Sequence, residues 1–265
     1  MATKPTTKTE EISILQMTHD SVSFALIGTS PLIFNAVSFK SKQMLLMPRG
    51  RMTDADKAAN LKHNPPEEYR NSVYRSLDDA APTRLIFPAS AFKGAMMTAA
   101  LDLPGTKKTE IGRLSWVEGQ YVAIYGVPQL LMSVVRSADI NRTPDIRTRA
   151  ILPEWACVVH IRFVRPKLSA QAMAHLVAAG GITSGIGDFR QEKGKGSFGQ
   201  YQPVDAADAA FKRIVTAGGR AAQDAALADP VCYDVETEEM LSWVSAEIIR
   251  IGDAKQPSKK RKEAA

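Results

Sequence analysis

The sequence has few cysteines and no long apolar run, and these absences exclude several classes of protein. Only two cysteines, Cys157 and Cys232, occur in 265 residues, too few to hold a small secreted domain together by disulfides. No uninterrupted apolar stretch of about 18 residues is present, so we expect no transmembrane helix. The N-terminal residues MATKPTTKTEE lack the apolar core of a signal peptide. We therefore expect a soluble, cytoplasmic protein without a membrane partner.

Histidine is also scarce, and the motifs of metal and nucleotide chemistry are missing. The four histidines are far apart, and none stands at metal-ligand spacing with a cysteine: His19, His63, His160 and His175. One G-x-G-x-x-G match, at residues 194–199, is followed by an extended segment with a proline, where a dinucleotide fingerprint requires a helix. We therefore expect neither a metal ion nor a cofactor.

The composition of the sequence is typical of a globular protein, and its surplus of positive charge is unevenly distributed along the chain. Hydrophobic residues make up 45% and charged residues 23%, and the formal net charge is +6. Residues 253–265 alone carry a net charge of +3 and have no apolar anchor, so we predict a disordered basic tail. A positive surplus of this kind suits an anionic partner.

Two interior stretches are basic as well, each with a net charge of +4. Residues 40–75 hold eight lysines and arginines against four acids, and residues 136–167 hold seven against three. Both stretches are poor in regular periodicity, so we expect basic side chains on long loops. Arginine dominates the second stretch, and its planar guanidinium suits bidentate phosphate contacts. The alternative is that these charges only solvate the loops.

Apolar patterning predicts the regular elements. Segments rich in β-branched and aromatic residues are predicted to form strands: 22–27, 85–87, 121–125, 130–135, 157–164 and 198–204. A helix is predicted at 88–101 because a proline stands in its first turn, and another at 168–179 because Gly-Gly follows it. A third is predicted at 236–251, where acidic residues occupy the first turn. Residues 40–82 contain five prolines and glycines and read as an irregular loop.

This order of elements predicts an α+β fold. We expect a ferredoxin-like antiparallel sheet with helices on one face, long basic insertions and a C-terminal helical extension. The predicted organisation is a core at 1–204 with an insertion at about 39–82, a helical extension at 205–252 and the basic tail at 253–265.

The densest functional signal is a glycine-rich stretch at residues 180–201. Seven of these 22 residues are glycine, interleaved with Arg190, Lys193 and Lys195 and with the aromatic residues Phe189, Phe198 and Tyr201. Closely spaced glycines let the backbone N–H groups approach a phosphate. Sites that bind single-stranded nucleic acid typically combine cationic side chains, aromatic rings and a backbone that side chains do not cover. The alternative is a hairpin whose aromatic side chains fill the core.

Two segments resemble one protein family. Residues 87–96, FPASAFKGAM, resemble the hydrophobic-Pro-Gly-Ser-Ser-hydrophobic-Lys-Gly-Ala helix start of RAMP proteins, and residues 185–201 resemble their glycine-rich loop, which ends in Gly-x-Phe-Gly. The turn at 29–32 is also similar. Ala89 and Ala91 depart from the usual small-residue pair, and the residues after 205 have no counterpart in the family.

The sequence thus resembles the RAMP superfamily, either the backbone-subunit type of CRISPR effector complexes or a phage-borne relative. This resemblance implies an RRM-like fold that binds single-stranded RNA or DNA. It also implies homo-oligomers side by side along the strand, with other effector subunits as further partners. In backbone subunits an insertion and a hairpin "thumb" grip the strand, and residues 40–75 and 136–149 are the candidates here. The predicted nucleic-acid-binding residues are Lys40, Lys42, Arg49, Arg51, Lys93, Arg136, Arg142, Arg147, Arg149, Gly185, Gly187, Arg190, Lys193, Lys195 and Phe198.

Two other functions stay open at this point. The family also includes metal-independent endoribonucleases that process CRISPR RNA, and His63 in the first basic stretch is the candidate general acid or base. A phage structural protein or a single-stranded-DNA-binding protein is the other alternative. No partner base for His63 is evident in the sequence, so we expect a binding protein without catalytic residues.

Overall fold

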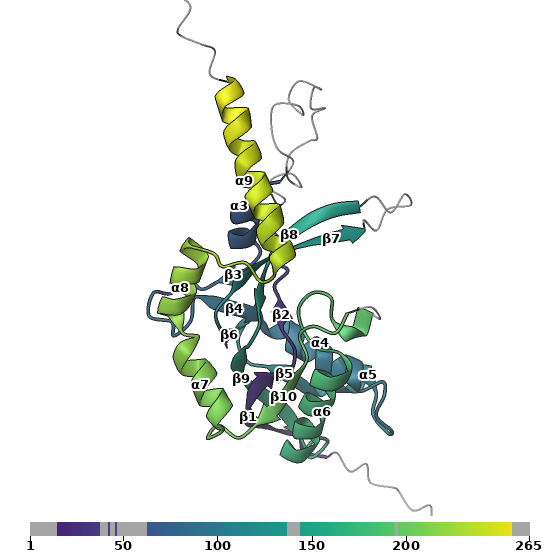
Figure 1. The fold of residues 1–265 in the computed structure, drawn as a ribbon. Coiled ribbons are helices and arrows are strands. Elements are labelled where there is room, and N and C mark those ends of the chain that lie inside the picture. Colours follow the sequence, from purple (N-terminus) through teal and green to yellow (C-terminus); the bar gives the residue numbers. More distant parts are fainter. Residues whose placement is uncertain are drawn as a thin grey trace, which may run out of the picture.

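The chain folds around a curled antiparallel sheet. The structure, a computed structural model, describes residues 15–37, 42, 46, 63–136, 144–193 and 196–255. Over these residues the chain is a mixed α+β protein with seven α-helices (Figure 1), which confirms the predicted α+β class. None of the helices in this part of the chain is both long and apolar enough to cross a lipid bilayer.

The main sheet has seven strands, six of them in the order β10-β1-β9-β6-β4-β3. Along the chain these are β1 (Thr18–Gly28), β3 (Tyr74–Arg75), β4 (Leu85–Pro88), β6 (Tyr121–Tyr125), β9 (Ala156–Arg165) and β10 (Tyr201–Val204), and β5 (Ser115–Val117) pairs with the later part of β9. Every pairing is antiparallel. The longest pairing joins β1 to β9, and β9 also pairs with β6 and β5, while the other side of β1 pairs with β10.

A smaller sheet continues from the main one. Its strands are β2 (Leu32–Ile33), β7 (Gln129–Arg136) and β8 (Pro144–Leu152), in the order β2-β8-β7. Strands β7 and β8 form a hairpin whose far end projects from the body of the protein (Figure 1). Residues 144–152 of the second basic stretch, where we expected a loop, therefore form the strand β8. Its alternation was hard to recognise because two of its inward-facing residues, Thr148 and Ala150, are polar or small.

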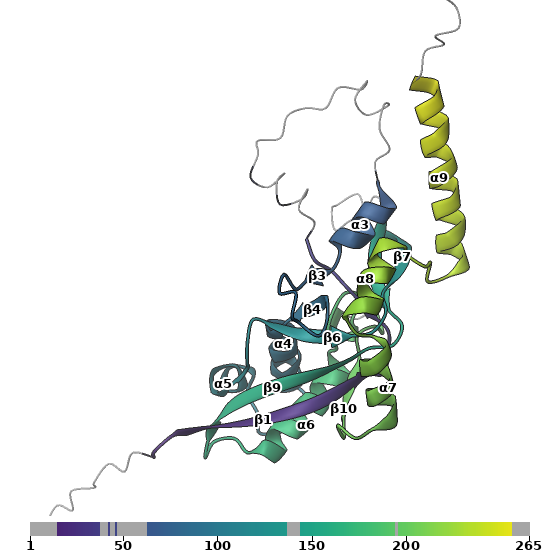
Figure 2. The same cartoon turned by 90° about the vertical axis from the view of Figure 1, so that its left-hand side faces the viewer.

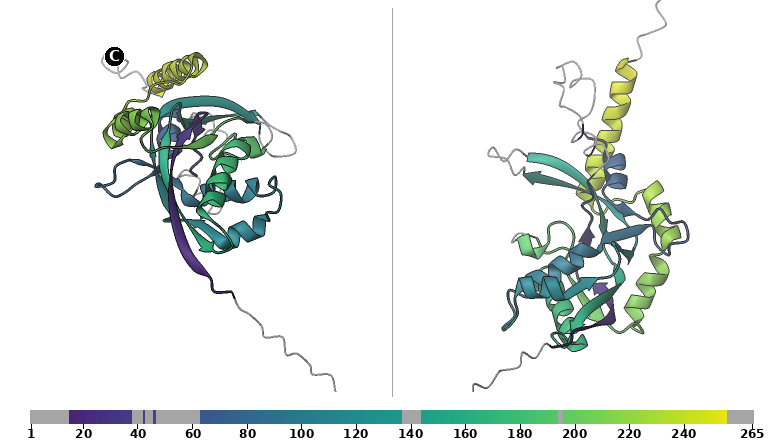
Figure 3. Two further views of the ribbon diagram at one scale, coloured as in Figure 1. Left: turned by 90° about the horizontal axis from the view of Figure 1, so that it is seen from below. Right: turned by 180° about the vertical axis from the view of Figure 1, so that it is seen from behind.

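Helices cover both faces of the main sheet. One face carries α4 (Ala89–Ala99), α5 (Lys108–Leu114) and α6 (Ala170–Thr183), and the other carries α7 (Ala209–Ala217) and α8 (Arg220–Ala228), as Figures 1 and 3 show. Phe211 and Ile214 of α7 pack against Ala25 and Ala156 of the sheet. The prediction had helices on one face only, and the difference arises because the predicted extension at 205–252 folds back over the second face.

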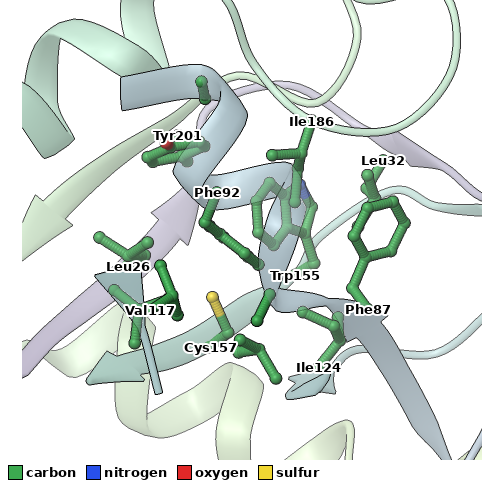
Figure 4. Packing of buried hydrophobic residues seen from close by; sticks show 14 of the residues in the cluster. Leu26, Leu32, Phe87, Phe92, Val117, Ile124, Trp155, Cys157, Ile186 and Tyr201 are labelled. Carbon is green, nitrogen blue, oxygen red and sulfur yellow. The ribbon is translucent and has the colours of Figure 1, made fainter. Parts of the chain in front are cut away.

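The main core lies between the sheet and helices α4 and α6 (Figure 4). Trp155 is fully buried there, and its indole N–H donates to the carbonyl of Ser30 at 2.9 Å. Tyr201 packs between the rings of Phe92 and Trp155, with ring centroids 5.9 and 6.2 Å apart. Since Tyr201 is only 1% exposed, it fills the core, as the alternative interpretation of the glycine-rich stretch expected.

The first basic stretch is more regular than predicted. Within residues 63–82 the structure has the helix α3 (Pro65–Asn71) and the strand β3. Two prolines made this segment look irregular, but they occupy the first turn of α3, where a missing N–H costs nothing. Asn64 caps the helix by accepting from the N–H of Glu67.

The last helix, α9 (Val235–Lys255), begins against the hairpin and then leaves the body (Figure 2). Thr237 is fully buried, and its hydroxyl accepts from the N–H of Met132 on β7 at 3.2 Å. Met240 and Leu241 pack against the core. Farther along the helix, Trp243 is 64% exposed and Ile248 49% exposed. The second half of α9 therefore carries large apolar side chains that no described residue covers.

Gln223 of α8 ties the C-terminal helices to the sheet. Its side chain is fully buried, and its Oε1 accepts from the N–H groups of Arg84 and Leu85 at 2.8 and 2.9 Å. Its Nε2 lies 2.8, 3.1 and 2.8 Å from the carbonyl oxygens of Ile124, Gly126 and Gly218. One side chain thus satisfies main-chain groups of two strands and of the loop between α7 and α8.

We predict that Gln223→Leu destabilises the protein by about 2–4 kcal/mol, because it leaves several buried N–H and C=O groups without partners. Urea denaturation followed by circular dichroism measures the free energy of unfolding. Gln202→Ala is the matched control, since Gln202 is an exposed residue of β10 and its loss should leave stability nearly unchanged. Equal stability of the two variants would contradict this role of Gln223.

Candidate nucleic-acid interface

Two of the predicted arginines lie side by side on the hairpin. Side chains alternate along a strand, so Arg147 and Arg149 project from the same face of β8. Arg147 is exposed and forms no ion pair with another described residue. Arg136, at the end of β7, pairs with Pro144 and therefore points to the opposite face. The structure thus brings two of these three arginines together.

An ion pair joins the hairpin to the glycine-rich loop, which we define as residues 184–200. The Arg149 guanidinium donates to the carboxylate of Asp188, and both side chains are largely or partly buried. Burial, with the neighbouring charge of Arg147, lowers the pKa of Arg149 to about 10. The guanidinium stays charged at neutral pH, so the pair is an electrostatic contact between segments 39 residues apart.

Arg190 is also held by the loop itself. Its Nε donates to the Glu192 carboxylate at 2.7 Å, and its guanidinium donates to the carbonyl of Gly187 at 3.2 Å. The sequence alone does not show that Asp188 and Glu192 pair with these arginines, because ion pairing depends on the fold. Their positions beside these arginines mean that two of the predicted phosphate contacts already have acidic partners. The net positive charge of this surface therefore comes from cations that have no acidic partner among the described residues, such as Arg147.

The glycines of the loop serve its internal packing. Gly185 and Gly187 have φ of 68° and 87°, a region that side chains disfavour. A Cβ at Gly187 would stand 2.6 Å from the carbonyl oxygen of Ile33, and one at Gly185 would stand 2.9 Å from that of Gly199. Both glycines are buried. The fold therefore requires glycine here whether or not a phosphate approaches.

The N–H groups of the loop are also used within the fold. Six of them donate to main-chain carbonyls at 2.7–3.3 Å: those of Ser184, Gly185, Ile186, Asp188, Phe198 and Gly199. The sequence interpretation expected such groups to face a phosphate. In the structure these six donors bond within the loop or hold it against α6, β2 and the turn after β1, so the loop offers a ligand its side chains.

The aromatic residues of the loop differ in exposure. Phe189 is 38% exposed and has φ of 49°, a conformation that non-glycine residues seldom adopt. Phe198, the predicted stacking residue, is partly buried, and its N–H donates to the carbonyl of Phe189 at 3.3 Å. Phe189 therefore presents the more accessible ring of the two. The sequence alone did not indicate which of the two rings would be exposed.

A cleft of about 240 Å³ separates this loop from α4. Thr98 bridges the two elements, since its hydroxyl donates to the Glu192 carboxylate at 3.4 Å. Gly94 faces open space, with no atom within 4 Å of its Cβ position. Lys93 is partly exposed and forms no ion pair with another described residue, but it lines a different pocket, with Gly119 and Gln120. The predicted helix start thus lies across a cleft from the glycine-rich loop.

The segments that carry the family resemblance also meet. The turn at 29–32 contacts the end of the glycine-rich loop, where Ser30 Oγ accepts from the N–H of Gln200 at 3.0 Å. The N–H of Gly199 donates to the carbonyl of Pro31 at 2.7 Å. Three segments separated by more than 50 residues each therefore surround one region of the core.

The remaining predicted residues are apart from this surface or outside the described residues. Lys42 is exposed and lies near β3 rather than β8. Lys193 is part of the short 3-10 helix Gln191–Lys193. The predictions for Lys40, Arg49, Arg51, Arg142 and Lys195 concern residues outside the described part of the chain, as does the basic tail after residue 255.

His63 is held by two carboxylates. Its Nδ1 lies 2.8 Å from Glu68 of α3, and its Nε2 lies 3.0 Å from Asp145 of β8. Both ring nitrogens are thus engaged in joining α3 to the hairpin. Across the described ranges, no group of three or more His, Cys, Asp or Glu residues is placed to bind a metal ion.

Comparison of the sequence with protein-family models and with curated proteins finds no significant match.

We predict that Asp188→Asn lowers the free energy of unfolding by about 1–3 kcal/mol, because the largely buried Arg149 loses its charged acceptor. Denaturation in urea provides the measurement. Asp20→Asn removes the acid of the exposed Arg165 pair (3.1 Å) and should have a smaller effect. If the two variants lose the same stability, the Arg149–Asp188 contact does not hold the hairpin to the loop.

Proposed function

We propose that this protein binds single-stranded nucleic acid, RNA in the first instance, and does so without catalysis. The proposed surface comprises the Arg147 face of β8, the glycine-rich loop and the start of α4. We further propose that copies lie side by side along the strand. The following observations support these proposals.

The observation that carries the proposal is the contact between the hairpin and the loop. The Arg149–Asp188 ion pair places the exposed Arg147 next to a loop that presents Phe189, and the start of α4, which also carries the partly exposed Lys93, lies across the cleft. Cations track a phosphate backbone, while an aromatic ring stacks on bases of any sequence. Segments from three distant parts of the chain thus combine the two kinds of contact that single strands require.

The topology supports a ferredoxin-like core as part of this proposal. Taken in chain order, β1, α4, β6, β9, α6 and β10 follow the β-α-β-β-α-β sequence of that fold. Their strands stand in the order β10-β1-β9-β6, all antiparallel. In this interpretation β3, β4, β5 and the β2-β8-β7 sheet are additions to the core.

Membership of the RAMP superfamily is likewise a proposal. It is supported by the positions of the segments that resemble the family: the FPASAFKGAM segment begins α4, and the glycine-rich loop follows α6. The β7–β8 hairpin is the proposed counterpart of the thumb. The three C-terminal helices, of which α7 and α8 cover the second face of the sheet, have no counterpart in the resemblance.

Assembly of several copies is supported by α9. Beyond the body of the protein this helix exposes Trp243, Ile248 and Ile249, at 64%, 49% and 64%. Side chains of this size are enriched where proteins associate. Exposed acids on its first turns, Glu236 and Glu238, could face the basic hairpin of another copy.

We predict that the affinity for an unstructured RNA oligonucleotide falls linearly with the logarithm of salt concentration, with a slope of about −0.7 for each phosphate neutralised. Arg147→Glu should weaken binding to all sequences alike and make the slope shallower by about 0.7, the contribution of one phosphate contact. Fluorescence anisotropy between dilute and physiological salt measures both quantities.

The matched control is Lys212→Glu, an equal change of charge on α7, which lies on the other face of the sheet. It should leave the slope nearly unchanged. Equal weakening by both variants would mean that overall charge, and not the β8 surface, attracts the nucleic acid. Binding that does not respond to salt would contradict the proposed function itself.

A further inference from the structure

The side chain of His63 joins two elements that are far apart in the sequence. It stands just before the N-cap residue of α3 and lies between Glu68 of that helix and Asp145 of β8, which is 82 residues away. The Nδ1 atom is 2.8 Å from a carboxylate oxygen of Glu68, and the Nε2 atom is 3.0 Å from one of Asp145. The His63 side chain is 25% exposed and the two acidic side chains are 32% and 33% exposed. All three groups are therefore only partly hydrated.

The two contacts require a particular protonation state of the imidazole. A carboxylate only accepts hydrogen bonds, whereas a neutral imidazole has one N–H donor and one acceptor nitrogen. Both contacts are hydrogen bonds only when both ring nitrogens carry a proton. An ordinary imidazole holds its proton more tightly than a carboxylate does, by about two pH units, so the shared proton belongs on His63. The imidazolium form then makes two charge-assisted hydrogen bonds.

Loss of one proton breaks this arrangement. Histidine is the side chain that changes charge between about pH 5 and pH 8. A neutral His63 keeps a donor for one carboxylate but turns the lone pair of its other nitrogen toward the second carboxylate, which is repulsive. One of the two contacts is then lost. The hairpin formed by β7 and β8 is therefore tied to α3 less firmly at high pH than at low pH.

Other charged groups on α3 and β8 have partners elsewhere. On α3, the Glu67 carboxylate accepts from the side-chain amide of Asn64 at 3.2 Å, and Arg70 donates to two main-chain carbonyls at the end of α8. On β8, Arg149 is paired with Asp188. Protonation of His63 is thus the change that acts on the contact between these two elements.

The clamp lies close to the proposed binding surface. Arg147, the exposed cation of that surface, comes two residues after Asp145, so both side chains project from the same face of β8. Arg136 of β7 pairs with Pro144 and points to the opposite face. The charge of His63 therefore decides how far the Asp145 carboxylate is balanced next to Arg147.

We propose that His63 is a pH-sensitive clamp that regulates the nucleic-acid surface. In the imidazolium form it ties the hairpin to α3 and balances the charge of Asp145 beside Arg147. In the neutral form the hairpin is held less firmly, and the Asp145 carboxylate opposes an approaching phosphate. A single strand is therefore bound more tightly at about pH 6 than at about pH 8. This regulation rests on the proposed function, whereas the clamp itself does not.

Hydrogen exchange of the full chain tests the clamp without nucleic acid. Exchange of the amides of β7 and β8 is compared between His63→Gln and the unaltered protein at the same pH, so that the intrinsic pH dependence of exchange cancels. At about pH 6 the variant should exchange roughly 2- to 5-fold faster, the range expected for one partly exposed ion pair. At about pH 8 the two proteins should exchange nearly alike. The amides of β9 are the internal reference and should not differ.

Fluorescence anisotropy with an unstructured RNA oligonucleotide at constant salt tests the regulation. From about pH 6 to about pH 8 the unaltered protein should lose roughly 2- to 5-fold more affinity than His63→Gln does. Asp145→Asn should also bind with little pH dependence, because its amide N–H can donate to a neutral His63. His175→Gln is the matched control, since it removes an exposed histidine of α6 and should keep the pH dependence of the unaltered protein.

The possible results separate the clamp from the proposed function. Equal exchange of the hairpin in His63→Gln and in the unaltered protein at about pH 6 would overturn the clamp and leave the proposed function standing. Faster exchange with an unchanged pH dependence of RNA binding would overturn the regulation alone. If the unaltered protein binds no RNA at any pH, the proposed function and its regulation fail, and faster exchange of His63→Gln still supports the clamp. Thermal denaturation checks that each variant is folded.

Discussion

The candidate interface depends on how one acidic residue is held. Asp188 accepts from the Arg149 guanidinium through its side chain, and its main-chain N–H donates to the carbonyl of Ile33 at 3.0 Å. Phe34, the next residue, donates to the carbonyl of Ala150 at 2.9 Å. The loop, the strand β2 and the hairpin are thereby fixed to one another. Without this junction the basic hairpin and the aromatic loop would be independent surface features.

The C-terminal helices contribute to the same rigidity from the other face of the sheet. Buried polar groups are costly unless every partner is satisfied, and Gln223 satisfies main-chain groups of β4, the end of β6 and the loop before α8. Arg70 adds a further contact, because its guanidinium donates to the carbonyls of Leu227 and Ala228 at the end of α8. The segment after residue 205 is therefore an integral part of the fold.

The elements with a clear apolar pattern could be predicted from the sequence. The strand at 121–125 matches β6, the strand at 157–164 lies within β9, and the helices at 88–101 and 168–179 correspond to α4 and α6. Elements with weak patterns were missed. In α3 the prolines suggested a loop. In β8 two inward side chains, Thr148 and Ala150, are polar or small, which weakens the apolar alternation. Helices α7 and α8 are held in place by tertiary contacts such as those of Gln223, which no local pattern predicts.

The candidate site was predictable only in part, for a related reason. Residue type identified Arg147, Arg149 and Arg190, but not the acids that hold two of them, because ion pairing joins residues distant in sequence. Glycine content suggested an open backbone, whereas Gly185 and Gly187 are needed by the packing of the loop. A cleft at the edge of the main sheet is lined by residues of α3, β3, β4 and β6. These elements are apart in the sequence, so local sequence patterns could not predict that they meet.

The central claim is that the protein binds single-stranded nucleic acid, and the absorbance ratio at 260 and 280 nm of protein purified in low salt tests it most directly. The account predicts a ratio raised well above that of protein alone, which falls after ribonuclease treatment in high salt, and a discrete small RNA when the bound material is sequenced. A ratio equal to that of pure protein, with no nucleic acid recovered and none bound on addition, would contradict the account.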